Sequence, residues 1–122
     1  MRTWLLLDSN YLCYRAAYST GQLAHGDVVT GVVFGFLRDV VGLQDLHDTN
    51  RVAFCFDFGK CLRQVDSPAY KASRSTKVRT KEEVRAMKEL RRQIDLLRSE
   101  YLTELGFRNV FFQEGYEADD II

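Results

Sequence analysis

Three short apolar runs alternate along the chain with segments whose apolar residues recur at helical spacing. The runs at residues 3–7, 51–56 and 108–113 are rich in strand-forming residues and predict β-strands. The helical spacing predicts helices at residues 11–18 and 30–46, and residues 118–122 are expected to begin another. Residues 58–79 show no period and include the only proline, so we expect a long loop there.

The clearest helix is predicted between Thr80 and Gly106. Thr80 and Glu83 have the spacing of a capping box, and Gly106 supplies a C-terminal stop. Its apolar residues fall on one broad face: Met87, Leu90, Ile94, Leu97, Tyr101 and Leu105. Its basic residues form a stripe roughly opposite: Lys81, Arg85, Lys88 and Arg92. We expect the apolar face to pack and the basic stripe to be free to meet phosphates.

This alternation of strands and helices predicts an α/β fold with a mainly parallel sheet and right-handed crossovers. The 122 residues are enough for one domain, and we find no internal repeat or linker. No apolar run approaches the roughly 20 residues of a membrane span, and Asp8 comes too early for a secretory signal. The three cysteines include no Cys-x-x-Cys pair, so neither a disulfide framework nor a zinc knuckle is supported. A cytoplasmic location with reduced thiols is the expectation.

The formal net charge of zero hides an asymmetry along the chain. Residues 60–98 hold 12 of the 17 Lys and Arg and 5 of the 17 Asp and Glu, which is +7, so the remainder carries −7. A solvated charged helix would account for this. The alternative is a surface for a polyanion beside a site that gathers carboxylates, as a metal-dependent nuclease requires.

Acidic residues follow all three predicted strands. They are Asp8, then Asp57, then Glu117, Asp119 and Asp120. In parallel sheets the carboxyl ends of the strands meet at one edge, where sites form. Two carboxylates about 4 Å apart repel by roughly 4 kcal/mol at an effective dielectric of 20. A cluster of five therefore favours a divalent hard cation, Mg²⁺ or Mn²⁺, over zinc, which prefers His and Cys. Taken singly, Asp8 could be a helix N-cap, Asp57 a turn residue, and the last three the favoured acids of a helix N-terminus.

Three blocks of residues carry most of the candidate chemistry: Leu-Leu-Leu-Asp8-Ser-Asn-Tyr-Leu-Cys-Tyr-Arg15-Ala-Ala-Tyr18, then Phe-Cys-Phe-Asp57 with Arg63 and Tyr70-Lys71-Ala-Ser-Arg74, then Gly115-Tyr-Glu117-Ala-Asp119-Asp120-Ile-Ile. These blocks resemble the flap endonuclease and 5′ nuclease family, most closely the domain fused to bacterial DNA polymerase I and its stand-alone bacteriophage relatives. They occur in the family's order, and the last block is the most specific. The resemblance implies a PIN-like, three-layer fold and two-metal hydrolysis of phosphodiesters near 5′ ends or flap junctions in DNA, with RNA in hybrids as a further substrate. It also implies a place in DNA replication and repair in a bacterial or phage-infected cell.

The same resemblance implies roles for individual residues. Those that would hold metals directly or through water are Asp8, Asp57, Glu117, Asp119 and Asp120, with Asp119 also counted as catalytic. Tyr70 would stack on a terminal base, and Lys71 and Arg74 would act on the scissile region as catalytic and DNA-binding cations. Arg15 and Arg63 would contact phosphates. The basic stripe resembles the arch that the family folds over single-stranded DNA, and Gly31 and Gly35 fit either close approach to DNA or tight packing against another helix.

Family members continue beyond the last block with a further strand carrying an aspartate pair for the second metal, and with a helical module that grips duplex DNA. Residues 1–122 therefore resemble the N-terminal part of the family's domain, truncated after the third strand, and a split nuclease completed by another subunit is the alternative. We expect the chain alone to bind metal weakly and to cleave poorly or not at all.

Three other functions stay open from the residues. A PIN-type ribonuclease would share the fold and act on RNA. A nucleic-acid-binding subunit without catalysis would bind DNA regardless of Asp119 and Asp120. A phosphatase of the haloacid dehalogenase type needs an aspartate two residues after Asp8, where this chain has Asn10.

Overall fold

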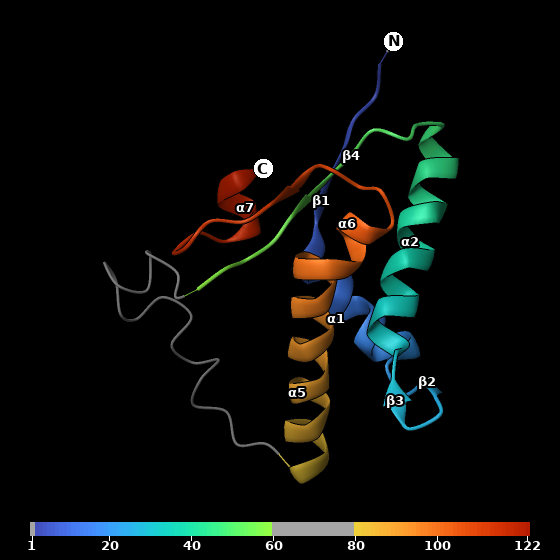
Figure 1. Ribbon diagram of the computed structural model, residues 1–122, viewed down its shortest axis with the longest axis vertical. Helices are drawn as coiled ribbons and strands as arrows, with labels where there is room; N and C mark the ends of the chain where they lie inside the picture. The colour runs from blue at the N-terminus through green and yellow to red at the C-terminus, as the bar shows by residue number, and fades with distance from the viewer. Residues whose placement is uncertain (1, 60–79) are drawn as a thin grey trace.

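The computed structural model describes residues 2–59 and 80–122 (Figure 1). Its elements before the gap are β1 (Leu5–Asp8), α1 (Ser9–Thr20), β2 (Ala24–His25), β3 (Val28–Val29), α2 (Gly31–His47) and β4 (Val52–Cys55). Those after it are α5 (Lys81–Leu96), the π-helical turn η1 (Leu97–Tyr101), α6 (Leu102–Glu104), β5 (Val110–Phe111) and α7 (Ala118–Ile121). No helix in these two described segments is long and apolar enough to cross a membrane.

The three main strands form a parallel sheet in the order β1-β4-β5, as the sequence predicts. Leu5 aligns with Val52 and Asp8 with Cys55, while Phe54 aligns with Val110. All four residues of the central strand β4 are buried, as expected of a parallel strand covered on both faces. The parallel order brings the carboxyl ends of all three strands to one edge of the sheet.

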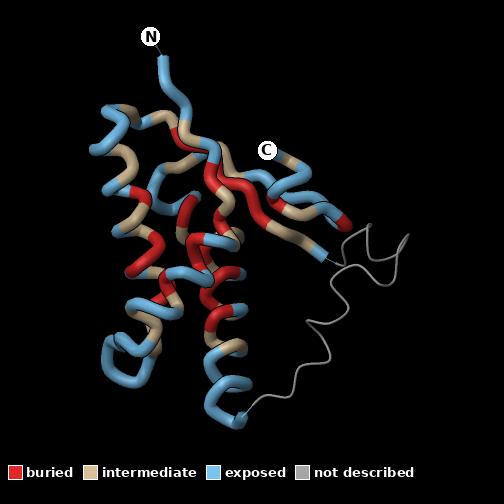
Figure 2. The backbone as a smooth tube through the Cα atoms, turned by 180° about the vertical axis from the view of Figure 1, so that it is seen from behind, coloured by how far each residue is buried: buried red, intermediate tan, exposed pale blue. Residues whose placement is uncertain are grey.

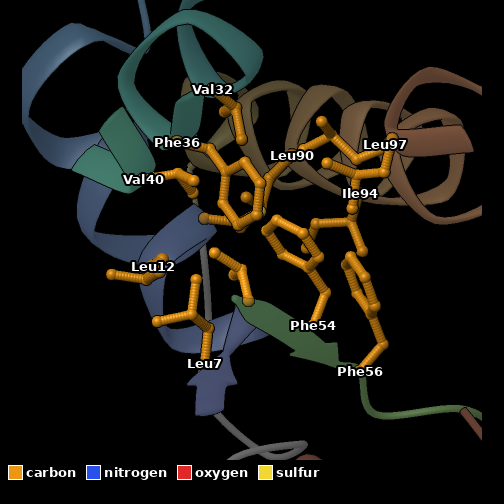
Figure 3. Packing of buried hydrophobic residues seen from close by; sticks show 13 residues of the cluster. Leu7, Leu12, Val32, Phe36, Val40, Phe54, Phe56, Leu90, Ile94 and Leu97 are labelled. Atoms are coloured by element: carbon orange, nitrogen blue, oxygen red, sulfur yellow. The ribbon is translucent and has the colours of Figure 1, made fainter. Parts of the chain in front are cut away.

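The hydrophobic core lies between one face of the sheet and the helices α1, α2 and α5 (Figures 2 and 3). Phe54 of β4 lies at its centre, with its ring centroid 5.8 Å from that of Phe36 in α2. Phe107, which precedes β5, meets the Phe54 ring edge-on at 4.9 Å. On α5 the buried residues Leu90 and Ile94 belong to the predicted apolar face. This packing fixes the helices that flank the carboxyl edge of the sheet.

The two glycines at the start of α2 serve helix packing. A Cβ atom added at Gly35 would lie 2.8 Å from the Cβ of Ala16 in α1, closer than real side chains approach. At Gly31 an added Cβ would collide with the Thr20 carbonyl, and Thr20 Oγ1 donates a hydrogen bond of 2.7 Å to the Gly31 carbonyl oxygen. Of the two explanations that the sequence left open, close contact between α1 and α2 is the one the structure supports.

The second face of the sheet is in contact with the short helix α7, which lies against β4. An apolar hollow of about 270 Å³ remains there, lined by Leu6, Ala53, Cys55, Phe111, Ile121 and Ile122. Helices thus flank the parallel sheet on both sides, in agreement with the predicted α/β layering.

Two local features differ from the expectation. Residues 24–29 form a small antiparallel hairpin of β2 and β3, where the sequence predicts no strand, and its turn contains Gly26 in the left-handed region at φ 62°. The long helix does not run regularly to its end, because α5 passes into the π-helical turn η1 before α6. There Ser99 Oγ donates to the Asp95 carbonyl at 2.6 Å, and such a side-chain bond competes with the regular helical ladder. Gly106, at φ 98°, ends the helix as predicted.

Candidate metal and nucleic-acid site

Asp8 lies at the carboxyl end of β1 and is the N-cap of α1. Its Oδ1 accepts a hydrogen bond of 3.2 Å from the Tyr11 backbone amide, which has no partner within the first turn of a helix. The N-cap interpretation of Asp8 is therefore correct.

Asp57 follows β4 by two residues and is joined to both neighbouring segments. Its backbone amide donates to Oδ1 of Asn10, at the start of α1, over 3.0 Å. Its own Oδ1 accepts a hydrogen bond of 2.7 Å from the amide of Ala118, the first residue of α7. Asp57 thus ties the ends of the first, second and third strand regions together.

The third acidic group surrounds the start of α7. Glu117 is the N-cap, and it forms a reciprocal capping box with Asp120, whose Oδ2 accepts from the Glu117 amide at 2.9 Å. Glu117 and Asp120 therefore lie at a helix N-terminus, one of the two interpretations open from the sequence, and there they also cap the helix. Asp119, between them, is exposed.

Three of the predicted carboxylates are close enough to interact, and their interaction contributes to the raised pKa of Asp8. Burial is the main cause that raises the pKa of the Asp8 carboxyl, and the Tyr11 amide opposes that rise. The negative charges of Asp57 and Asp119, together with a side-chain hydrogen bond to Asp119, raise this pKa further. Because these carboxylates repel one another, a proton or a cation placed among them would stabilise the arrangement.

The donor set is compatible with a hard divalent cation. Asp8, Asp57 and Asp119 offer only carboxylate oxygens, the ligands that Mg²⁺ and Mn²⁺ prefer. Within residues 2–59 and 80–122, however, no three acidic, His or Cys side chains are arranged as a group that could hold a metal ion. The structure therefore brings three of the five predicted ligands into electrostatic contact and gives the other two, Glu117 and Asp120, a capping role.

Four of the predicted nucleic-acid residues are exposed on helix surfaces. They are Arg15 on α1 and Lys81, Arg85 and Lys88 on α5. Figure 1 shows the first turns of α5 below the sheet, on the side where β1 ends and α1 begins. These cations are accessible to a polyanion.

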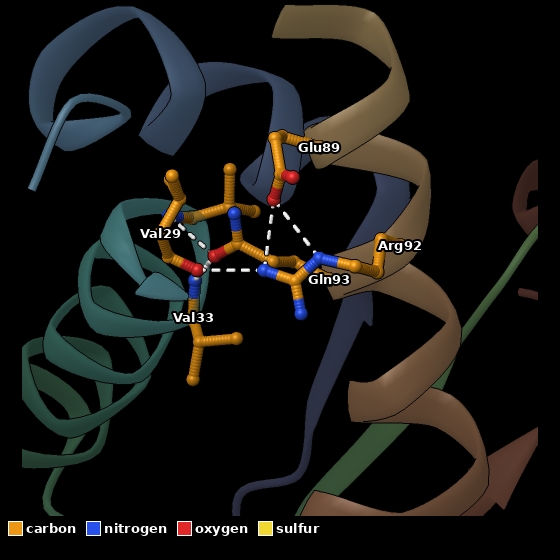
Figure 4. A network of polar contacts seen from close by, with 6 residues as sticks. Val29, Val33, Glu89, Arg92 and Gln93 are labelled. Carbon is orange, nitrogen blue, oxygen red and sulfur yellow. Dashed lines mark hydrogen bonds and ion pairs between the residues drawn. The ribbon is translucent and has the colours of Figure 1, made fainter. Parts of the chain in front are cut away.

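The expectation that the whole basic stripe is free to meet phosphates is wrong for its fourth member, Arg92, which binds partners within the protein. Its Nε and Nη2 pair with Glu89 at 2.9 and 2.8 Å (Figure 4). Nη2 also donates to the Val29 carbonyl of the hairpin at 2.7 Å. The hairpin that brings Val29 to α5 was not expected from the sequence, so this internal role could not be seen.

Four predicted site residues lie outside the described part of the chain: Arg63, Tyr70, Lys71 and Arg74. Their roles remain predictions.

Two residues near the site were not assigned a role from the sequence. Asn10 accepts the Asp57 amide, and its position two residues after Asp8 was the only available signal. Arg98 places its guanidinium 4.7 Å from the ring centroid of Phe58 and 5.4 Å from that of Phe112, and pairs with Asp95 at 3.0 Å. Arg98 thereby contacts Phe58, the residue that follows Asp57. No local sequence pattern predicts this contact.

A parallel sheet with carboxylates gathered at its carboxyl edge and exposed cations beside it defines an α/β protein with an acidic site. Comparison with family models gives the family: residues 3–122 match the 5'-3' exonuclease, N-terminal resolvase-like domain, and the chain belongs to this family. No curated protein sequence matches significantly.

Among solved structures, the chain is similar to one described as "Divalent metal ions (zinc) bound to T5 5'-exonuclease". The TM-score is 0.77 and the identity 21%, over 98% of this chain and 42% of that one. The two proteins therefore share a fold over nearly all of this chain, which spans less than half the length of that exonuclease.

Proposed function

We propose that this chain is the N-terminal part of a metal-dependent 5′ nuclease that hydrolyses phosphodiesters near 5′ ends or flaps in DNA. The observation that carries the proposal is that Asp8 ends β1 beside the end of β4, while Asp57, just after β4, binds the amide of Ala118, the residue before Asp119. Membership of the 5'-3' exonuclease family supports the reaction class.

The three carboxylates would hold Mg²⁺ or Mn²⁺, with Glu117 and Asp120 close by at the start of α7. A bound ion of this kind polarises a phosphate and lowers the pKa of water for in-line attack. The chain itself orients the Asp57 carboxylate, because Asp57 Oδ1 accepts the amide of Ala118 at the start of α7. Lys71 and Arg74 are proposed to offset charge that develops on the scissile phosphate.

The cations Arg15, Lys81, Arg85 and Lys88 are proposed to contact the nucleic-acid backbone. All four are exposed. Such contacts carry no sequence preference and release counterions, so binding should weaken steeply with added salt.

The test is cleavage of 5′-labelled flap DNA with the protein in excess, in Mg²⁺ or Mn²⁺. We expect weak metal-dependent cleavage by the chain, lost in Asp119→Asn and kept in Asp45→Asn, a control whose carboxylate is exposed on α2. Cleavage that Asp119→Asn leaves unchanged would contradict the proposed site.

A parallel digestion of structured RNA separates the nearest alternative. Faster cleavage of RNA than of flap DNA would point to a PIN-type ribonuclease. Salt-sensitive DNA binding without cleavage, indifferent to Asn at positions 119 and 120, would point to a binding subunit.

A further inference from the structure

We propose that Asn10 is a positioning residue for the acidic site, holding the main chain of Asp57 so that the Asp57 carboxylate is kept at the start of α7. The inference rests on the proposed function, because it assigns a role within the same site. It concerns a residue outside the five carboxylates and the cations assigned above.

The role follows from the hydrogen-bond pattern of the sheet. The amides of Phe54 and Phe56 donate to the carbonyls of Asn109 and Phe111 on the β5 side. Because donors alternate sides along a strand, the Asp57 amide is directed to the β1 side. There β1 has ended at Asp8 and the chain has turned into α1, so no further strand carbonyl follows.

The Asn10 side chain supplies the missing acceptor. Its Oδ1 lies 3.0 Å from the Asp57 nitrogen, and this contact extends the β1 side of the ladder by one hydrogen bond. Asp57 Oδ1 in turn accepts the Ala118 amide at 2.7 Å. A displacement of the main chain at Asp57 would therefore alter the hydrogen bond that Asp57 Oδ1 accepts from Ala118.

The amide chemistry of Asn10 suits this place. The Asp57 amide requires an acceptor in acidic surroundings, because Asp8 lies two positions before Asn10 and Asp57 carries a carboxylate of its own. Asparagine provides an acceptor oxygen without a further negative charge, whereas an aspartate here would add a like charge to the cluster. The structure thus assigns Asn10 a task that its charged analogue would perform at an electrostatic cost.

Amide hydrogen exchange tests the coupling without metal or activity. We expect Asn10→Ala to accelerate exchange of the Ala118 amide about fivefold or more, as loss of one supported hydrogen bond would. Asn10→Asp keeps the acceptor and should leave Ala118 protected. Asn50→Ala, an exposed asparagine at the opposite end of the sheet, is the matched control. Exchange of Ala118 that stays within the control range in Asn10→Ala would overturn the proposal.

A measurement on the unaltered chain keeps the inference testable if Asn10→Ala does not fold. A scalar coupling across the hydrogen bond, between the Asp57 amide nitrogen and the Asn10 side-chain carbonyl carbon, should be detectable. Its absence in spectra that show such couplings across the β1–β4 ladder would overturn the proposal.

Titration with Mn²⁺ separates this inference from the proposed function. In the unaltered chain Mn²⁺ should broaden the amide signals around Asp8, Asp57 and Ala118 first. Asn10→Ala should need about 10- to 100-fold more Mn²⁺ for the same broadening, the usual effect of losing a group that orients a ligand. No local broadening in the unaltered chain would defeat the proposed metal site, whereas equal Mn²⁺ requirements in Asn10→Ala and the Asn50→Ala control would defeat the positioning role.

Discussion

Gln93 of α5 caps Val32 of α2, although the two residues are 61 positions apart. Gln93 Oε1 accepts the backbone amide of Val32 at 3.0 Å and that of Val33 at the same distance (Figure 4). The N-cap residue Thr30 makes no side-chain capping bond to α2, so a side chain from another helix takes that place. Figure 4 also shows Arg92 next to Gln93, bound to the hairpin that precedes α2.

Replacing Gln93 by alanine should therefore destabilise the fold substantially. The change leaves the amides of Val32 and Val33 without their acceptor and opens space where a residue only 1% exposed had been. We expect the free energy of unfolding to fall by about 2–4 kcal/mol, measured by urea denaturation. Gln22→Ala, at an exposed site, should change it by less than about 0.5 kcal/mol. Equal effects of the two changes would contradict the capping role.

Alanine at Gly35 and alanine at Gly42, both in α2, should change the stability of the fold in opposite directions. At Gly35 a Cβ would press on Ala16, and we expect a loss of about 1–3 kcal/mol. At Gly42 a Cβ would meet nothing within 4 Å, so Gly42→Ala should stabilise the fold by roughly 0.5–1 kcal/mol through helix propensity. Thermal unfolding of both variants checks the close α1–α2 contact. A stabilising Gly35→Ala would show that the helices lie further apart.

Of two cations in the predicted stripe, we expect Lys88 to contribute to DNA binding and Arg92 to contribute to stability. Lys88 is exposed, and Lys88→Ala should weaken DNA binding and lower the slope of log K against log salt by about 1. Arg92 is held by Glu89 and the Val29 carbonyl, so Arg92→Ala should lower stability and leave that slope nearly unchanged. Binding isotherms at several salt concentrations, with urea denaturation of the same proteins, measure both. A larger slope change in Arg92→Ala than in Lys88→Ala would reverse the assignment.

The thiol of Cys13 should be inert in the folded chain. Cys13 has no exposed surface, and burial, helped by the negative charge of Asp8, strongly raises the pKa of its thiol. Because the thiolate is the reactive form, we expect no labelling of Cys13 by a disulfide reagent at pH 8 until the chain is unfolded. A Cys61→Ser background removes the cysteine that lies outside the described residues. Fast labelling of Cys13 under native conditions would contradict the burial.

Helices, strands and the edge of the sheet that carries the acidic residues could be predicted, because they depend on local sequence patterns. Helical spacing located α1, α2 and α5, and the acidic residue after each apolar run marked the carboxyl edge of the sheet. The approach of Asp57 and Asp119 to Asp8 followed from the parallel order alone.

What the sequence could not show depends on contacts between distant segments. Asn10 and Asp57 are 47 positions apart, and their hydrogen bond exists because the chain turns into α1 after Asp8 while it continues extended beyond Cys55, the residue that pairs with Asp8. Arg92 falls on the basic stripe by spacing, and only the folded hairpin brings a carbonyl to it. For Glu117 and Asp120 the residue types allowed both capping and metal binding, and geometry was needed to show the capping box.

The most direct test of the central claim is the anomalous signal of Mn²⁺ in crystals of the chain soaked with that ion. The account predicts a peak between Asp8, Asp57 and Asp119, lost in Asp119→Asn and kept in Asp45→Asn. A map with no peak at these three carboxylates at a Mn²⁺ concentration that occupies other sites in the same crystal would contradict it.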